Sequence, residues 1–343
     1  MESYTIPSQP ELSHRDRVSR IGIALVVMIV TNVLAGIVIS LLVSTFAPHL
    51  WDVEGFTELA GMFCMYPCSL IPTYFILKGI PSAAPEQRKL SPKTFFLFTA
   101  IAFLLMMGGS YIGQAVNGAI DLATGGTQGS EITDALQEYP LWMSIVMPFV
   151  VAPIMEELIF RKWLVDRLSP LGGSATIIIS GLFFGLFHGN LDQFFYAALI
   201  GAFLAYIYLN TGKIWHTMLI HAILNFFGGV LPTIFTASIP DFYTIMNSGD
   251  TTAMEEMIMQ YPLQYMGYLL TGLLPLFFGI AGLVVFCIYY KRLFRWITPC
   301  TVPKGERFKT IVVNFGFIAF TIVSIIEMVL VIVENVLNTT GGV

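Results

Sequence analysis

Charged residues are scarce in this 343-residue sequence. Asp, Glu, Lys and Arg together make up 11% of it, whereas 56% of the residues are hydrophobic. A soluble globular domain has about 25% charged residues, so the composition excludes an ordinary soluble protein. The net charge is −5 and no basic stripe is present, which argues against a nucleic-acid partner. The sequence therefore predicts a membrane protein whose main surrounding is the lipid bilayer.

Several short catalytic signatures are also missing. The sequence contains no His-Glu-x-x-His pattern for zinc and no Gly-x-Ser-x-Gly turn for a serine nucleophile. Its four cysteines show neither metal-ligand spacing nor a disulfide framework, and none lies beside a histidine in the sequence. A nucleophilic Ser or Cys therefore has no support, and we expect the cysteines to be small buried residues. They are Cys64, Cys68, Cys287 and Cys300.

Long apolar runs are abundant instead. A transmembrane helix needs roughly 20 mostly apolar residues, so the runs predict an all-α, polytopic membrane helical bundle with about 8 to 9 transmembrane helices. The runs at 174–188 and 194–210 are short and could form a shallow hairpin. The remaining runs lie near 21–47, 59–77, 95–118, 141–168, 214–235, 263–290 and 311–335.

Lys and Arg collect in alternate connections between these runs, and such clusters mark the cytoplasmic side. Nine passes then place the N-terminus in the cytoplasm and the C-terminus outside, and we expect an integral membrane protein. No small-residue cleavage site follows the first run, so we expect that run to be retained as a span. The cationic connections are 1–20, 78–93, 162–167, 213 and 291–309, while 122–140 and the polar, peripheral segment 236–262 contain no Lys or Arg.

One predicted span contains three charged residues in the stretch APIMEELIFRKWL, residues 152–164. A charge at the centre of a bilayer costs about 2.5 to 3.5 kcal/mol on insertion scales, so such residues are rare without a role. Glu157 and Arg161 are four residues apart on a helix and can pair with each other. Glu156 points about 100° away from Glu157, so we expect its partner to lie on another span.

Two histidines are candidates for that partner. His188 and His221 each lie in an apolar segment, whereas His216 is expected at the membrane boundary near Lys213. Each of the two also has a neighbour one helical turn away. Phe184 precedes His188 and Asn225 follows His221.

These residues suit the hydrolysis of a peptide bond. Glu156 and a neighbouring histidine could deprotonate a water molecule, while a second histidine and the Asn225 amide could stabilise the oxyanion. The same acid and the two histidines, Glu156, His188 and His221, could alternatively bind zinc. Two readings without proteolysis also remain: polar contacts that hold helices together, and a proton relay in a transporter.

Three motifs resemble one known family. The stretch EELIFR, from Glu156, matches a motif of two glutamates followed by an arginine. FGLFH, from Phe184, matches a motif of a phenylalanine and a histidine, and HAILN, from His221, matches one of a histidine and an asparagine. The chain thereby resembles the type II CAAX prenyl protease and its bacterial relatives, the CPBP or Abi intramembrane proteases.

That resemblance implies an intramembrane glutamate-dependent endopeptidase without a cofactor. It implies that Glu156 and His188 activate water, that His221 and Asn225 stabilise the oxyanion, and that Glu157, Arg161 and Phe184 support the site. The implied substrate is a membrane-associated peptide or a lipidated protein. The wider family also includes non-catalytic immunity proteins against bacteriocins, so an immunity or scaffold protein is a further alternative. The expected organisation is a cytoplasmic segment 1–20, one transmembrane domain 21–336 with its catalytic core at 141–235, and a tail 337–343.

Overall fold

The computed structural model describes residues 12–125, 139–293 and 297–340, and every regular element in these ranges is a helix. This confirms the predicted all-α class. The first eleven residues of the predicted segment 1–20, the end of the predicted tail and most of the 122–140 connection lie outside the described residues.

Eight of the helical segments are long and apolar enough to cross a membrane. The predicted hairpin at 174–210 consists of two helices of unequal length. The second part forms the 21-residue helix Leu191–Thr211, which is long enough to span, whereas Gly173–Phe187 has 15 residues and is the shorter apolar helix. The eight spans are His14–Phe46, Phe56–Lys78, Pro92–Thr124, Leu141–Leu171, Leu191–Thr211, Ile214–Thr236, Pro262–Leu293 and Phe315–Leu337.

Several of these spans are composites of shorter helices, because π-helical turns interrupt them. The unbroken helices are α1 (His14–Phe46), α4 (Pro92–Thr124), α9 (Gly173–Phe187), α10 (Leu191–Thr211), α15 (Pro262–Leu293) and α17 (Phe315–Thr340). The composite spans contain α2 (Phe56–Phe63) with α3 (Ser69–Lys78), then α6 (Leu141–Val146) with α7 (Ala152–Glu157) and α8 (Asp166–Leu168), and finally α11 (Ile214–Asn225) with α12 (Leu231–Thr236).

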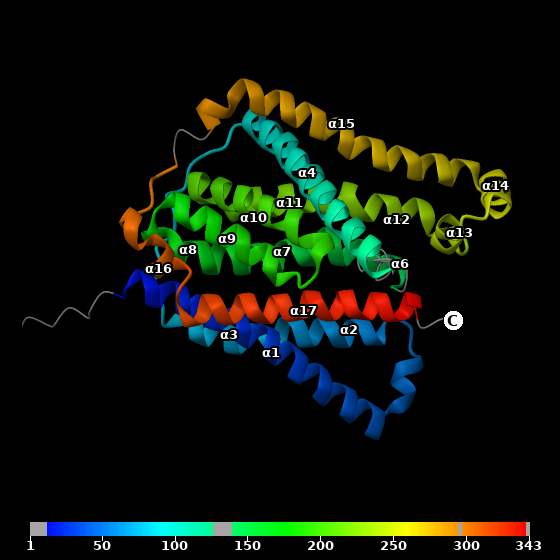
Figure 1. Ribbon diagram of the computed structural model, residues 1–343, viewed down its shortest axis with the longest axis horizontal. Coiled ribbons are helices and arrows are strands. Elements are labelled where there is room, and N and C mark those ends of the chain that lie inside the picture. Colours follow the sequence, from blue (N-terminus) through cyan, green and yellow to red (C-terminus); the bar gives the residue numbers. More distant parts are fainter. Residues whose placement is uncertain (1–11, 126–138, 294–296, 341–343) are drawn as a thin grey trace, which may run out of the picture.

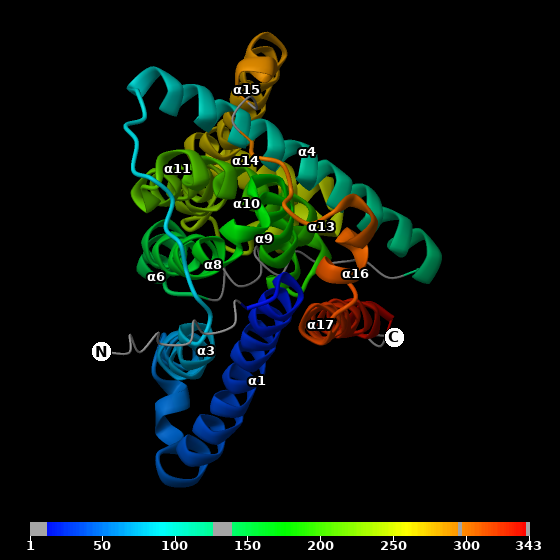
Figure 2. The same cartoon turned by 90° about the vertical axis from the view of Figure 1, so that its left-hand side faces the viewer.

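The helices lie in three tiers. Figure 1 shows α7, α9, α10 and α11 in the middle, with α4 and α15 above them and α1, α3 and α17 below. The view turned by 90° keeps the same order (Figure 2). The middle tier is therefore covered by other helices on two sides.

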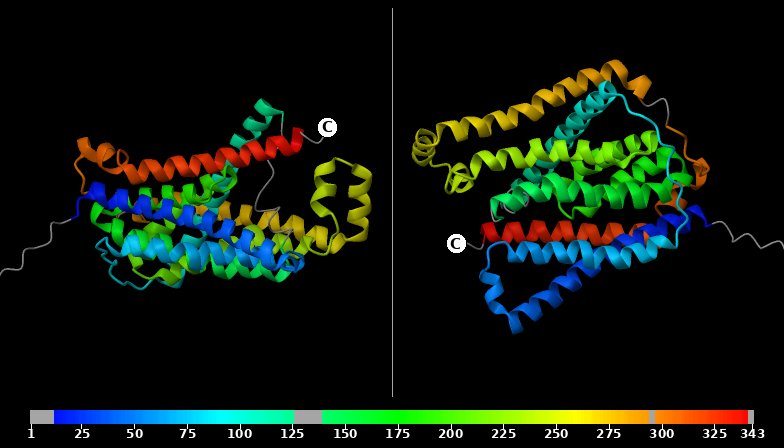
Figure 3. Two further views of the ribbon diagram at one scale, coloured as in Figure 1. Left: turned by 90° about the horizontal axis from the view of Figure 1, so that it is seen from below. Right: turned by 180° about the vertical axis from the view of Figure 1, so that it is seen from behind.

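The two ends of the bundle differ in charge. The start of α1 and the α8–α9, α10–α11 and α15–α16 connections lie at one end, where α16 is Arg307–Ile311. Lys and Arg lie in or just before these connections, such as Lys213 between α10 and α11 and Lys162 and Arg167 at the end of the span before α9. The end of α17 lies at the opposite end, a relation also visible from below and behind (Figure 3). The long helices thus run back and forth between the two ends, and which end faces the cytoplasm stays a prediction.

The segment 236–262, expected to be polar and peripheral, folds into two short helices, α13 (Phe242–Ser248) and α14 (Thr251–Gln260). A small apolar cluster of Ile239, Phe242 and Met257 holds them together. The sequence did not predict this packing, because acids and other polar residues interrupt the apolar residues of the segment.

Close packing of α9 against α10 positions the end of α9 deep in the bundle. A β-carbon at Gly181 would lie 2.6 Å from the Ala202 β-carbon, and one at Gly185 would lie 2.7 Å from the Phe194 carbonyl oxygen. Glycines four residues apart let helix backbones approach in lipid, where van der Waals packing is a main source of helix association. The short helix α9 therefore carries its C-terminal residues, Phe184 and His188, into the middle tier.

Candidate active site

The span that carries the two glutamates is not a regular α-helix. Residues Met147–Val151 and Leu158–Val165 are π-helical, and the six-residue helix α7 lies between them. Pro153 contributes to the irregularity because a proline has no N–H to donate to a preceding carbonyl. π-Helical turns are frequent at functional sites, and here they flank Glu156 and Glu157.

Asn225 compensates for one consequence of that proline. In the π-helical turn Ala152 N–H donates to the Met147 carbonyl, so the next carbonyl, that of Pro148, would require an N–H at position 153. The side-chain amide of Asn225 donates to the Pro148 carbonyl instead, at 2.8 Å. Asn225 was predicted as an oxyanion donor. The structure adds this hydrogen bond between helices, and the bond uses one of the two amide hydrogens of Asn225.

Glu157 and Arg161 form the ion pair that their spacing predicts. Arg161 Nε lies 2.9 Å from Glu157 Oε2, and both side chains are completely buried. Arg161 Nη2 donates to Oε1 of the same carboxylate at 3.1 Å, and Nη1 donates to Ser180 Oγ at 3.2 Å. A buried ion pair needs such additional hydrogen bonds to offset desolvation.

His221 lies between the two neighbouring carboxylates. Its Nδ1 is 3.2 Å from Glu157 Oε1, and its Nε2 is 3.8 Å from Glu156 Oε2. Because a carboxylate only accepts hydrogen bonds, the short contact places a proton on Nδ1 and turns Nε2 toward Glu156. Glu157 and Arg161 therefore orient the ring that faces Glu156.

Among the described residues, Glu156 has no cation close to its carboxylate, whereas Glu157 Oε2 lies 2.9 Å from Arg161 Nε. Its side chain is 13% exposed, and Oε2 is buried without a hydrogen-bond partner. At a separation of 3.8 Å from His221 Nε2, a direct hydrogen bond is absent, yet a single water oxygen at about 2.8 Å from each atom would contact both. Such an orphan atom in a polar site is a place for water or substrate.

His188 is oriented by its own helix. Its Nδ1 lies 2.8 Å from the Phe184 carbonyl oxygen, which requires a proton on Nδ1 and leaves Nε2 available to accept one when the ring is neutral. The Phe184 ring lies 4.9 Å from the His188 ring and 5.8 Å from the His221 ring between centroids. Phe184 thus packs against both histidines, with Arg161 5.0 Å from its ring centroid.

Sequence reasoning missed two neighbours of this site. Ser180 supports Arg161, and the Phe160 ring packs on Phe184 with 4.9 Å between centroids. Spacing could have indicated Ser180, because it precedes Phe184 and His188 by four and eight residues on one helix. His216, expected at the membrane boundary near Lys213, is 2% exposed within the protein, and its position relative to the membrane stays a prediction.

The residues proposed for zinc do not converge as a metal site. Within the part of the chain that the structure describes, no three His, Cys, Asp or Glu side chains are placed to hold one ion. The Nδ1 contacts of both histidines, with a carbonyl and with Glu157, leave the Nε2 atoms free, an arrangement also common for metal-bound histidines. Zinc therefore stays an alternative to be tested, and no step is assigned to a metal.

Comparisons with known proteins point to the same region. Residues 138–227 match the family of type II CAAX prenyl endopeptidases described as Rce1-like. A Bacillus subtilis (strain 168) protein named "Putative membrane peptidase YdiL" is 26% identical over 187 residues, which cover 53% of this chain and 70% of that protein. The human CAAX prenyl protease 2 is 31% identical over 100 residues, which cover 23% of this chain and 30% of that protein. No solved structure matches the chain.

The matched region contains all three motifs, together with the π-helical turns and the Phe184 contacts described above. The resemblance predicted from the motifs is thereby confirmed, and it supports an intramembrane endopeptidase. Residues 138–227 are thus similar to the Rce1-like type II CAAX prenyl endopeptidase family.

Proposed function

We propose that this chain hydrolyses a peptide bond inside the membrane with a water molecule activated by Glu156 and His188. The observation that carries the proposal is the buried, unpartnered Oε2 of Glu156 beside the Nε2 of His221. An unpaired carboxylate oxygen among apolar helices is costly, and a bound water removes that cost while it is held for reaction.

The order of proton transfers follows from the hydrogen bonds. Glu156 accepts a proton from the water as the water oxygen attacks the carbonyl carbon of the substrate. His188 carries its own proton on Nδ1, so its Nε2 is free to take over the proton from Glu156 and to deliver it to the leaving amine. The water oxygen forms the new bond to carbon, and the C–N bond breaks when the nitrogen is protonated.

His221 and Asn225 would stabilise the oxyanion. When His221 is protonated on both nitrogens, it donates to Glu157 from Nδ1 and into the site from Nε2. Asn225 has one amide hydrogen left after its bond to Pro148. Preorganised donors of this kind contribute about 10² to 10³ in rate each.

The substrate class follows from the surroundings of the site. Glu156 lies in a span, so the scissile bond must reach the interior of the bundle from the membrane or from its surface. A membrane-associated peptide or a lipidated protein meets this requirement. The charge difference between the two ends also leads us to propose that the N-terminus is cytoplasmic in a bacterial plasma membrane, which antibody access to tags at either terminus would test.

The function is tested by comparing peptides released in cells that express the wild type or Glu156→Gln. We expect a set of peptides that is present with the wild type and absent with Glu156→Gln at equal membrane abundance. Glu256→Gln, which changes an exposed acid on α14, is the matched control and should behave as wild type. Identical peptide sets for the wild type and Glu156→Gln, with the cellular phenotype retained, would instead establish a non-catalytic immunity or scaffold role.

The zinc alternative needs a separate measurement on purified protein. We expect that cleavage of an identified substrate continues after treatment with a chelator, with no zinc bound in stoichiometric amount. Loss of activity on chelation and its recovery with added zinc would overturn the metal-free mechanism.

A further inference from the structure

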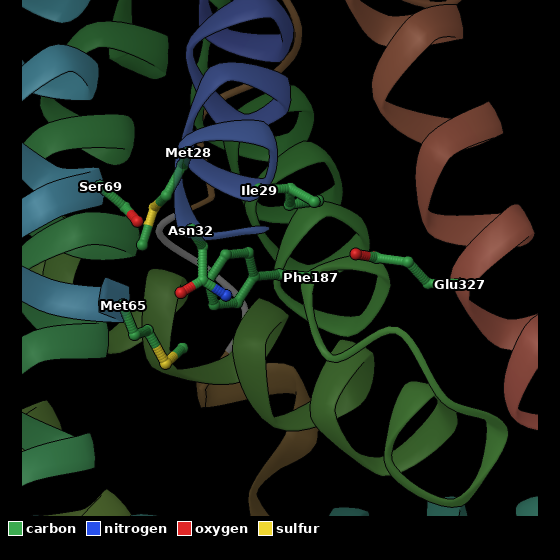
Figure 4. A pocket seen from close by; sticks show the side chains of 7 residues that line it. All are labelled: Met28, Ile29, Asn32, Met65, Ser69, Phe187 and Glu327. Carbon is green, nitrogen blue, oxygen red and sulfur yellow. The ribbon is translucent and has the colours of Figure 1, made fainter. Parts of the chain in front are cut away.

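A small cavity lies between α1, α3, α9 and α17, outside the site described above (Figure 4). Its volume is about 90 Å³, room for about three water molecules at the volume each occupies in the liquid. The walls combine three polar side chains with two thioethers and an aromatic ring. These are Asn32, Ser69, Glu327, Met28, Met65 and Phe187, and Ile29 completes the lining.

Two of the polar groups have no partner. Glu327 lies near the middle of α17 and Asn32 near the middle of α1, in otherwise apolar helices. Within the described residues neither side chain forms a hydrogen bond or an ion pair. Acids and amides inside a membrane are expensive unless something satisfies them, so this pair marks a place for a ligand.

The polar lining consists mainly of acceptors. Ser69 donates its hydroxyl hydrogen to the Cys64 carbonyl at 2.7 Å, so only its lone pairs are free. Glu327 contributes a carboxyl group, and Met28 and Met65 contribute sulfur atoms that accept weakly. The Phe187 ring adds an aromatic face, which attracts cations. A group with several N–H donors and a positive charge complements this wall.

The cavity adjoins the end of α9. Phe187 lines it, and the next residue is His188. Gly189 follows with φ of 65°, and a β-carbon there would lie 3.3 Å from Glu327 Oε2. Figure 4 shows the Glu327 carboxyl group extending from α17 toward Phe187 and Ile29. The cavity therefore lies beside the turn that carries His188, although His188 itself does not line it.

We propose that the cavity is a substrate-binding subsite for a primary ammonium group, supplied by a lysine side chain or by the amino terminus of a peptide. The assignment to substrate rests on the proposed endopeptidase function. The ammonium donates to Glu327 and to the Asn32 carbonyl, and its alkyl stem packs against the two methionines and Phe187. The subsite would select peptides that place one amine at a fixed distance from the scissile bond.

Binding can be measured without cleavage. The probe is n-propylammonium chloride, followed by saturation-transfer NMR on the full-length protein in phosphatidylcholine nanodiscs, with n-propanol as the uncharged comparison. We expect binding of the ammonium to the wild type and affinity lower by about tenfold or more for Glu327→Gln, as loss of a charged hydrogen-bond partner implies. The n-propanol should give no signal at the same concentration.

A second variant guards against misfolding. Asn32→Leu keeps the size of the side chain and should also weaken ammonium binding, while both variants keep the wild-type melting temperature. Competition by a lysine peptide with a blocked amino terminus, and by a lysine-free peptide with a free amino terminus, identifies the source of the amine. No ammonium binding to the wild type, or equal binding to Glu327→Gln, overturns the proposal.

The outcomes for the cavity and for proteolysis are separate. Glu156→Gln should abolish peptide release yet bind propylammonium as the wild type does. Binding that depends on Glu327 in a protein that releases no peptide would refute the endopeptidase and leave a subsite for amines. Peptide release without such binding would refute the amine subsite and leave the endopeptidase function standing.

Discussion

Two carboxylates inside the bundle have opposite surroundings. Glu157, in the middle tier, is completely buried and contacts Arg161 and His221. Glu327, in the lower tier, is partly exposed at a cavity and has no partner among the described residues. Burying either carboxylate in a membrane costs free energy. Only for Glu157 do contacts within the protein offset that cost.

The difference indicates two uses of an intramembrane acid. A fully paired carboxylate fixes the position of its neighbours, as Glu157 fixes the His221 ring. An unpaired carboxylate is available to something that arrives from outside the fold. Glu156 lies between these extremes, because His221 faces it at 3.8 Å while one of its oxygens remains without a hydrogen bond.

The largest effect should come from breaking the paired acid. Arg161→Leu leaves Glu157 buried without its counter-charge, so we expect the free energy of unfolding to fall by about 3 to 5 kcal/mol. Thermal unfolding in detergent measures this. The double variant Glu157→Leu with Arg161→Leu should recover much of the loss, because it removes both charges. An Arg161→Leu protein as stable as the wild type would show that the pair does not hold the site.

Removing an unpaired proton acceptor should affect rate and leave stability nearly unchanged. For His188→Gln we expect kcat for an identified peptide to fall about 10²- to 10⁴-fold, as for loss of a general base or acid, with KM little changed. His49→Gln, at an exposed position, is the control. A kcat within twofold of wild type would remove His188 from the mechanism.

Asn225 is predicted both to stabilise the fold and to contribute to catalysis, and a change at Pro153 separates these two roles. Asn225→Ala leaves the Pro148 carbonyl unsatisfied, so the free energy of unfolding should fall by about 1 to 3 kcal/mol. Adding Pro153→Ala supplies a backbone N–H for that carbonyl and should recover part of the stability. If kcat stays low in the double variant, the amide also contacts the substrate; if kcat recovers, Asn225 only positions the helices.

The smallest effect on stability should come from the unpartnered acid. Glu327→Gln removes no contact, so the free energy of unfolding should change by less than about 0.5 kcal/mol. Chemical unfolding beside the wild type checks this. A loss above about 2 kcal/mol would mean that Glu327 has a structural partner, and the contrast with Glu157 would disappear.

Much of the fold and part of the site could be predicted before the tertiary structure. Apolar runs of membrane length gave the spans, and a four-residue spacing gave the Glu157–Arg161 pair, because both depend on helix geometry alone. The contacts of His221 could not be predicted in this way. They join residues 64 positions apart, and no periodicity specifies which nitrogen of a ring meets which carboxylate.

The sequence by itself determined the membrane class, the alternation of charged and uncharged connections, and the three motifs, because these follow from composition and local spacing. Only the tertiary structure decided that Asn225 caps a carbonyl left by Pro153, that Phe184 packs against both histidines, and that Glu327 adjoins the turn after His188. Each of these depends on how separate helices approach one another, and that approach is set by side-chain packing and by glycines at the contacts.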